Sequence, residues 1–245
     1  MYVPLQVGAE GKEQIGYERD DSGDNISKLN PYFCELTGTY WAWKNLEADY
    51  IGIAHYRRHY SMHPFKRDIS SAVLNYNELE PYLDRVKVFT PTKRNYIIET
   101  LSSHYAHTHD PKHLDVTREI ISEKYPEYID SFDQVIERRW GYMFNMMIMK
   151  KSIYDKYCEW VFDILFELRE RLGEKGMSRF NRRYYGRIAE IIFNVWLNQM
   201  IKDGIIKKEE IKEIPIVKID KTNWFKKINA FLRAKYLHEK YERSY

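Results

Sequence analysis

The chain has 245 residues, of which 44% are hydrophobic and 31% are charged, and its formal net charge is +3. This length suits one α/β domain, and so small a net charge gives no general argument for nucleic-acid binding. No apolar run approaches the roughly 20 residues that a membrane span requires, and no signal peptide is evident. Two cysteines without metal-binding spacing favour the reducing cytoplasm.

Strand and helix patterns alternate along the first part of the chain. Met1–Val7 is strand-like, and a polar, acidic loop follows it. A helix is predicted over Pro31–Lys44, with Asn30 as its N-cap and the proline in its first turn. The short apolar run Tyr50–Ala54 predicts a buried central strand. Arg85–Thr90 predicts the next strand.

Helical patterns dominate after residue 95. Tyr142–Met149 is the one internal strand-like run there, and Glu213–Ile219 predicts a late edge strand because it contains Pro215. The alternation predicts an α/β fold with a mixed sheet flanked by helices and a helix-rich C-terminal half. We expect one domain over residues 1–222 and a separate basic helix over residues 223–245. The helices are predicted over Ile97–Ala106, Asp110–Tyr125, Pro126–Arg138, Ser152–Leu172 and Tyr184–Lys202.

Basic and aromatic residues gather directly after two predicted strands. Open α/β sheets place their ligand chemistry at the carboxyl ends of the strands. Guanidinium groups bind phosphate oxygens in a bidentate manner, and imidazolium groups add donors. The pattern predicts a phosphate or pyrophosphate site, against the alternative of solvated charges at the rim of the sheet. The residues are His55, Tyr56, Arg57 and Arg58 after the first strand, and Lys93 and Arg94 after the second.

A zinc site is a competing interpretation, because seven of the eight histidines lie between His55 and His113. Zinc needs ligands that converge from a rigid element. The residues after His55 include two arginines and Pro64, which oppose helical convergence and repel a cation. We therefore expect no metal and assign His104 and His107 to the anion site.

Two further groups of acidic residues have a structural and a functional interpretation. Glu190 lies in a predicted helix beside an apolar run, where a partly buried carboxylate suits a general base. The alternative is a buried ion pair with Arg187. Asp24 and Asn25 lie in an acidic loop without the bidentate glutamate of a calcium loop, so we interpret the loop as a turn.

The C-terminal segment is strongly basic. Residues 218–243 contain eight Lys or Arg residues and three acids, and Trp224, Phe225 and Phe231 contribute to one helical face. Basic amphipathic helices with aromatic residues lie on anionic membrane surfaces. We expect peripheral binding at the inner face of the cell membrane, against the alternative of a helix docked on the core.

Five long segments carry a recognisable pattern that extends over nearly the whole chain. They resemble a bacterial glycosyltransferase family of capsular and exopolysaccharide gene clusters, formerly described as a domain of unknown function, DUF4422. The segments are DNISKLNPYFCELTGTYWAWKN (24–45), DYIGIAHYRRHY (49–60), SHYAHTHDPKHLD (103–115), YMFNMMIMKKSIYDKYCEWVFDIL (142–165) and EIPIVKIDKTNW (213–224).

The resemblance implies a GT-A-like, Rossmann-like fold and a hexosyltransferase. The donor would be a UDP-sugar, with galactose or galactofuranose as the expected sugar, and the acceptor a lipid-linked oligosaccharide. In the GT-A fold, the equivalent of strand Tyr50–Ala54 ends in an Asp-x-Asp metal motif. Here basic side chains would replace the metal and neutralise the departing UDP, so no divalent cation is expected.

Residue roles follow from the same resemblance. Arg57, Arg58 and His55 would hold the diphosphate, and Tyr56 would position the donor or the leaving group. Glu190 would be the base on the acceptor side if the reaction inverts configuration. Asp24, Asn25 and Asn145 are assigned to the donor or acceptor vicinity, Asn145 within an "FN" run that resembles the acceptor-side strand.

The chain departs from the family pattern at its N-terminus. Relatives carry a further strand before the segment that matches Tyr2-Val3-Pro4-Leu5, and in a GT-A-like fold that strand holds the nucleotide base. We therefore expect either that the start codon is misassigned, or that the donor site is incomplete and activity is impaired. The alternatives are a non-catalytic protein that binds sugar nucleotides or polysaccharide, and a histidine-metal hydrolase.

Overall fold

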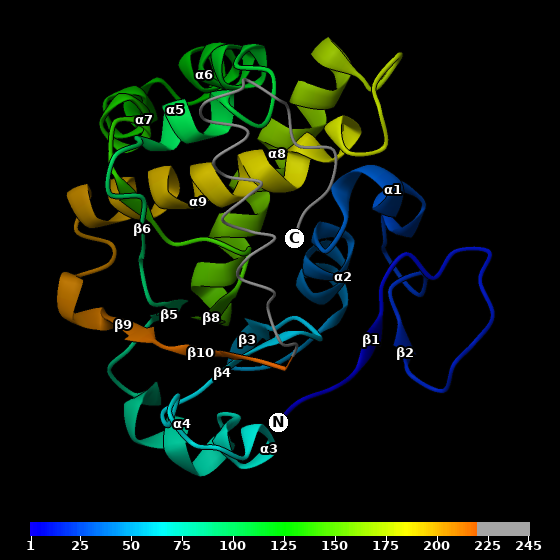
Figure 1. The fold of residues 1–245 in the computed structure, drawn as a ribbon, viewed down its shortest axis with the longest axis vertical. Helices are drawn as coiled ribbons and strands as arrows, with labels where there is room; N and C mark the ends of the chain where they lie inside the picture. Colours follow the sequence, from blue (N-terminus) through cyan, green and yellow to red (C-terminus); the bar gives the residue numbers. More distant parts are fainter. Residues whose placement is uncertain (220–245) are drawn as a thin grey trace.

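A four-stranded mixed sheet organises the molecule, for which a computed structural model describes residues 1–219 (Figure 1). The strand order is β3-β8-β5-β9, with β8 antiparallel to β3 and β5, and β9 parallel to β5. The predicted α/β class, a mixed sheet flanked by helices, is confirmed. The strands are β3 (Tyr50–Ile53), β5 (Val88–Pro91), β8 (Met147–Lys150) and β9 (Ile211–Ile214).

Three two-stranded pairings extend this sheet or lie beside it. The β1–β2 pair is parallel, whereas the β4–β10 and β6–β7 pairs are antiparallel. The predicted late strand is therefore two strands, β9 and β10, which are separated by Pro215. The bounds are β1 (Leu5–Gln6), β2 (Glu18–Arg19), β4 (Arg58–Tyr60), β6 (Arg94–Asn95), β7 (Trp140–Gly141) and β10 (Ile216–Lys218).

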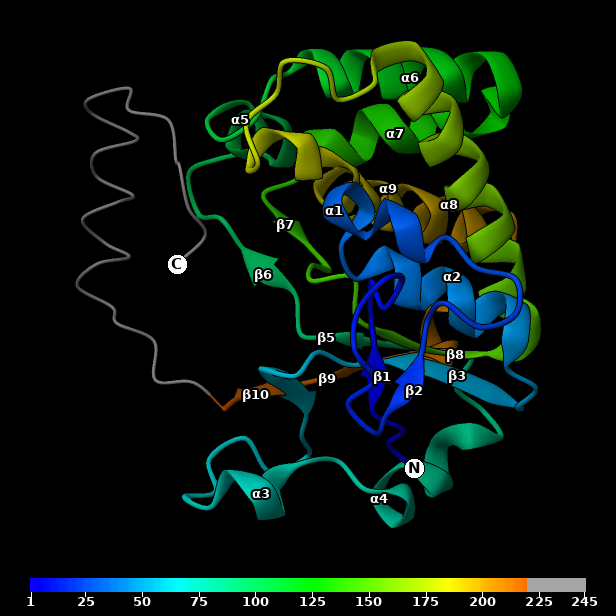
Figure 2. The same ribbon diagram turned by 90° about the vertical axis from the view of Figure 1, so that its right-hand side faces the viewer.

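Helices cover both faces of the sheet. Figure 2 shows α1, α2 and α5–α9 on one face, and the short α3 and α4 on the other. Helices dominate after residue 95, as predicted, and none within residues 1–219 combines the length and apolar character needed to span a membrane. The bounds are α1 (Asn30–Phe33), α2 (Leu36–Asn45), α3 (Ile69–Ala72), α4 (Tyr76–Leu83), α5 (Leu101–Ala106), α6 (Lys112–Lys124), α7 (Ile129–Ile136), α8 (Lys151–Leu172) and α9 (Tyr184–Lys202). The expected C-terminal helix lies outside the described residues.

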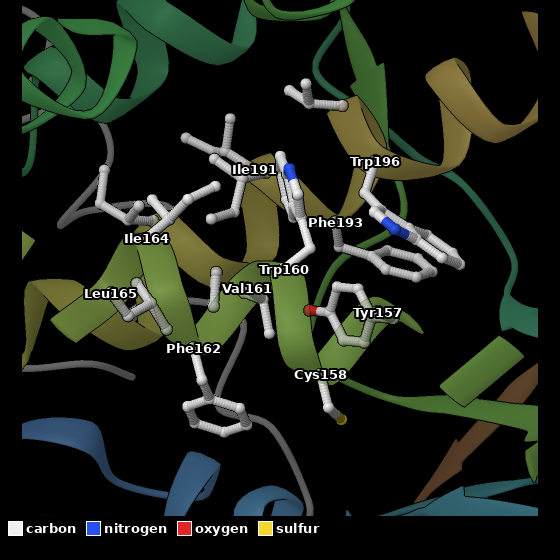
Figure 3. Packing of buried hydrophobic residues seen from close by; sticks show 14 of the residues in the cluster. Tyr157, Cys158, Trp160, Val161, Phe162, Ile164, Leu165, Ile191, Phe193 and Trp196 are labelled. Carbon is white, nitrogen blue, oxygen red and sulfur yellow. The ribbon is translucent and has the colours of Figure 1, made fainter. Parts of the chain in front are cut away.

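Alternate side chains of the central strands enter two separate cores. Met147 and Met149 of β8 face the larger helical core, whereas Ile148 faces the smaller core under α3 and α4. This is the period of two that a strand imposes. In the larger core, α8 and α9 pack through aromatic rings, with Tyr157 5.3 Å from Trp196 between ring centres (Figure 3).

The position predicted for the Tyr50–Ala54 strand is wrong. Among the described residues, β3 lies at an edge of the four-stranded sheet rather than at its centre. Only Ile51 of this strand is buried, and Gly52 is exposed. Gly52 lies opposite Ile148, whose Cγ1 would stand 3.0 Å from an added Cβ, so a larger residue would require the Ile148 side chain to shift.

The predicted helix over Pro31–Lys44 is also interrupted. Cys34 has a φ of 53°, which ends α1 and separates it from α2. Asn30 lies inside α1 and is not its N-cap. Its amide instead donates hydrogen bonds to the Cys34 carbonyl at 2.8 Å and to Thr37 Oγ1 at 3.2 Å. These bonds stabilise the break, and Glu35 follows directly after it.

A buried aspartate fastens the N-terminal loop to this break. Asp20 is fully buried and accepts hydrogen bonds from the Gly8 and Ala9 N–H groups at 2.7 and 2.9 Å. The hydroxyls of Ser27 and Thr37 each donate to it at 2.6 Å. Because every donor faces a carboxylate oxygen, the desolvation cost of the charge is offset.

Asp20→Asn is therefore expected to destabilise the protein by about 2–4 kcal/mol, because an amide NH₂ would face N–H and O–H donors. Urea denaturation measures this change. Asp24→Asn, at an exposed carboxylate of the same loop, is the control and should change stability by about 0.5 kcal/mol or less. Equal effects of the two substitutions would contradict the assigned role of Asp20.

Two histidines belong to the helical core. His113 stacks on Tyr184, with 3.9 Å between ring centres, and its Nδ1 bonds to the Tyr105 hydroxyl at 2.8 Å. His109 stacks on Phe180 at 5.1 Å. Burial lowers the pKa of His109 to about 3 and that of His113 to about 4. Both rings are neutral in the folded protein at pH 7.

Stability should fall as pH is lowered through the range between the unfolded pKa, about 6.5, and these folded values. In that range the unfolded chain binds protons that the folded chain does not, so each histidine should cost about 2 kcal/mol between pH 6.5 and 5. Urea denaturation at pH 7 and pH 5 tests this. His113→Gln should reduce the pH dependence. Equal wild-type stability at both pH values would refute the assignment.

Candidate active site

One edge of the sheet collects the ends of four strands. Because β3 and β5 are both antiparallel to β8, they run in the same direction and their carboxyl ends meet at this edge. β9 is parallel to β5 and also ends there, whereas β8 begins there. The segments that adjoin this edge contain Arg58, Arg94, Asn145 and Lys218. The two basic segments named from the sequence therefore follow strands that end at the same edge.

A tight turn places the basic cluster after β3. The His55 N–H donates to the Arg58 carbonyl at 3.1 Å, and the Arg58 N–H donates to the His55 carbonyl at 3.0 Å, so the chain reverses into β4. Tyr56, at the tip of the turn, is 78% exposed. Arg57 packs over the Tyr56 ring at 5.0 Å. The turn directs Arg58 to a half-buried position and leaves Tyr56 at the surface.

Two consecutive left-handed residues hold this turn from the other side. Phe144 and Asn145 have φ values of 81° and 49°. His55 Nε2 donates to the Phe144 carbonyl at 2.5 Å, and the Arg58 guanidinium lies 4.6 Å from the centre of the Phe144 ring. Non-glycine residues in this conformation cost free energy and cluster at functional sites.

The cations at this edge are poorly compensated. Lys218 lies opposite Arg58 in the β4–β10 register. Burial lowers the pKa of Lys218, and the nearby Arg58 and Arg94 lower it further. Burial, followed by repulsion from Arg57, lowers the pKa of Arg58. Arg58 Nε is buried without a hydrogen-bond partner in residues 1–219. This donor and the unbalanced positive charge fit an anion such as a diphosphate.

Two carboxylates border the cations. Glu190, on α9, is 5% exposed, and its two oxygens lie 3.3 and 3.2 Å from Arg187 Nη1. Glu35 Oε1 accepts a hydrogen bond from Asn145 Nδ2 at 2.8 Å. The pKa of Arg187 is raised, chiefly by Glu190, and Glu35 contributes. The predicted ion-pair alternative for Glu190 is thus the arrangement observed.

His104 and His107 both contact Glu99. Their Nδ1 atoms lie 2.7 and 2.6 Å from the two oxygens of Glu99. Although burial raises the pKa of Glu99, the hydrogen bonds from the two histidines lower it overall. His104 packs on Tyr96 at 4.4 Å, and Arg94 lies near enough to lower the pKa of His104, after the larger effect of burial. The Nδ1 atoms of both histidines are therefore engaged by Glu99.

Three other predicted site residues have local partners. Lys93 forms an ion pair with Glu213 at 3.0 Å and does not extend the cluster of unpaired charge. Asp24 accepts a hydrogen bond from the Tyr40 hydroxyl, and Asn25 donates to the carbonyls of Asp21 and Gly23. Asp24 and Asn25 therefore hold a turn beside α2, which is their structural interpretation.

The structure adds Glu35 and Lys218 to the site. Glu35 was missed because one unbroken helix was predicted around it. Lys218 was grouped with the basic C-terminal segment, although its place at the end of a strand-like run is a signal in the sequence. Arg187 was named only as a partner for Glu190.

The histidines do not converge in the described part of the chain. His55 bonds to the Phe144 carbonyl, and His63 pairs with Glu78 at 2.9 Å. Within residues 1–219, no group of three or more His, Cys, Asp or Glu side chains is arranged to hold a metal ion.

Comparisons with known proteins agree with the resemblance read from the sequence. The family described as "Domain of unknown function (DUF4422)" matches residues 1–202. The chain belongs to this family. It is also similar to the apo structure of the bifunctional glycosyltransferase WbbM, with a TM-score of 0.81 and 30% identity over 89% of this chain. The match spans 42% of the WbbM chain. No curated protein sequence matches.

Proposed function

We propose that this protein is a glycosyltransferase that moves a hexosyl unit from a UDP-sugar to a lipid-linked oligosaccharide in capsule or exopolysaccharide synthesis. The observation that carries the proposal is the cluster of Arg58, Arg94 and Lys218 at the carboxyl ends of β3, β5 and β9, with the buried Arg58 Nε unpaired. The similarity to the WbbM glycosyltransferase supports this assignment.

In the proposed reaction, the cluster binds the diphosphate of the donor. Arg58 and Lys218 are held opposite each other by the β4–β10 register, so they present two cations on adjacent strands. When the sugar leaves, negative charge develops on the departing UDP, and fixed cations in a partly buried site stabilise it. In a GT-A-like fold these side chains take the place of the usual metal ion. Galactose or galactofuranose is the proposed sugar.

We also propose peripheral association with an anionic membrane, where a lipid-linked acceptor is available. The basic, aromatic segment 218–243 supports this from the sequence, although almost all of it lies outside the described residues. Phe65 is 97% exposed in the loop between β4 and α3, and Lys66 and Arg67 follow it. An exposed aromatic residue beside cations is suited to the headgroup region of a membrane.

UDP binding by isothermal titration tests the diphosphate site. Arg58→Ala is expected to weaken UDP binding about 10- to 100-fold, because it removes charge-assisted hydrogen bonds to phosphate. Arg118→Ala is the matched control, since Arg118 pairs with Asp133 at 2.7 Å on the surface. Equal UDP affinity of Arg58→Ala and wild type would place the diphosphate elsewhere.

UDP release from a panel of UDP-hexoses, with and without EDTA, tests the reaction. Release that resists EDTA is expected, because side chains are proposed to neutralise the diphosphate. UDP binding without release would favour the non-catalytic sugar-nucleotide-binding protein. Release that EDTA abolishes would contradict the metal-independent assignment.

A further inference from the structure

We propose that Glu35, and not Glu190, is the base that takes the proton from the acceptor hydroxyl. The proposal rests on the glycosyltransferase function above and assigns a catalytic residue within it. Both carboxylates border the same cations, so the choice between them depends on which carboxylate oxygens already have partners and which are accessible.

Glu190 already forms an ion pair with Arg187. Its side chain is almost fully buried, and Arg187 Nη1 lies within 3.3 Å of both oxygens. Arg187 is the residue that follows Gly186 in the first turns of α9, so the pair is held on one helix. Both oxygens of Glu190 therefore already face a guanidinium in a buried position, where an acceptor hydroxyl has little access. Glu190 therefore serves to hold Arg187.

Glu35 has one oxygen fixed and the other available. Asn145 Nδ2 donates to Oε1 at 2.8 Å, and the same amide donates to the Gly186 carbonyl at 2.9 Å. Oε2 accepts no hydrogen bond from any residue in the described range, and the Glu35 side chain is only half-buried. A base must be oriented by one contact and open to its substrate at another, and Glu35 meets both conditions.

The local backbone is built to bring Glu35 to this position. The left-handed Cys34 ends α1, so Glu35 stands at the N-cap of α2 without making a capping hydrogen bond. An added Cβ on Gly186 would lie 3.6 Å from Glu35 Oε1, which shows how closely α9 approaches the carboxylate. Three segments that are distant in sequence therefore meet at Glu35.

The left-handed residues Phe144 and Asn145 contact both the base and the proposed diphosphate site. Asn145 holds Glu35, and the preceding residue, Phe144, holds His55 and underlies Arg58. A displacement reaction needs its base and its leaving-group site on opposite sides of the reacting carbon at a fixed separation. Because the base and the diphosphate site contact adjacent residues of one segment, their separation is fixed.

The proposed step is a single displacement that inverts the anomeric centre. The acceptor oxygen forms a bond to C1 of the sugar while its proton passes to Glu35 Oε2. The bond between C1 and the β-phosphate oxygen breaks, and its electron pair remains on UDP, where Arg58 and Lys218 stabilise the charge. Glu35 then releases the proton to water.

Steady-state kinetics of UDP release by the full chain from a panel of UDP-hexoses test the assignment, with water or added membrane lipid extract as acceptor. Glu35→Gln should lower kcat by about 100-fold or more, with the UDP dissociation constant unchanged. Glu35→Ala should regain activity in sodium formate, because a small carboxylate can replace the lost base. Glu47→Gln, in the exposed segment that follows α2, is the control and should behave as wild type.

The outcomes separate the two proposals. Wild-type turnover together with more than about one tenth of that rate in Glu35→Gln would overturn the base assignment alone. Loss of UDP affinity in Glu35→Gln, or no formate rescue of Glu35→Ala, would show a structural role and also overturn it. If Glu190→Ala, rather than Glu35→Ala, is rescued by formate, the base is Glu190. Absence of turnover by the wild type with every donor would refute the transferase function itself.

Discussion

The site depends on the left-handed backbone of Phe144 and Asn145 where the chain enters β8. The Phe144 carbonyl accepts the hydrogen bond from His55, its ring supports Arg58, and the Asn145 amide binds both Glu35 and Gly186. Each left-handed residue costs about 1–3 kcal/mol, which hydrogen bonds in a buried setting offset. Four segments thereby share one rigid reference point at the edge of the sheet.

Sheet topology explains why the charges accumulate here. The common direction of β3, β5 and β9 brings three basic segments to one edge, and Lys218 is held opposite Arg58 by strand register. Burial lowers the pKa of Arg58 and of Lys218, and repulsion from neighbouring cations lowers both further. Such an arrangement stores unfavourable electrostatic energy that a bound anion relieves, which is a property of binding sites rather than of stabilising surface pairs.

Local features of the sequence predicted much of this arrangement. The basic residues after Tyr50–Ala54 and Arg85–Thr90, the α/β class and the long helices α8 and α9 follow from short-range patterns. The edge position of β3 could not be predicted, because it is decided by pairing with β8. The break at Cys34 was missed because side-chain hydrogen bonds from Asn30 override helical propensity there. Glu35 was missed with it, since its partner Asn145 is 110 residues away in sequence.

A crystal structure of the chain with UDP tests the central claim most directly, that the Phe144–Asn145 pair joins the diphosphate site to Glu35. The expected structure has phosphate oxygens about 2.7–3.0 Å from Arg58 and Lys218. Phe144 and Asn145 should remain left-handed, with the Glu35–Asn145 hydrogen bond intact. A diphosphate bound away from this edge, or a pair that leaves the left-handed region when UDP binds, would contradict the claim.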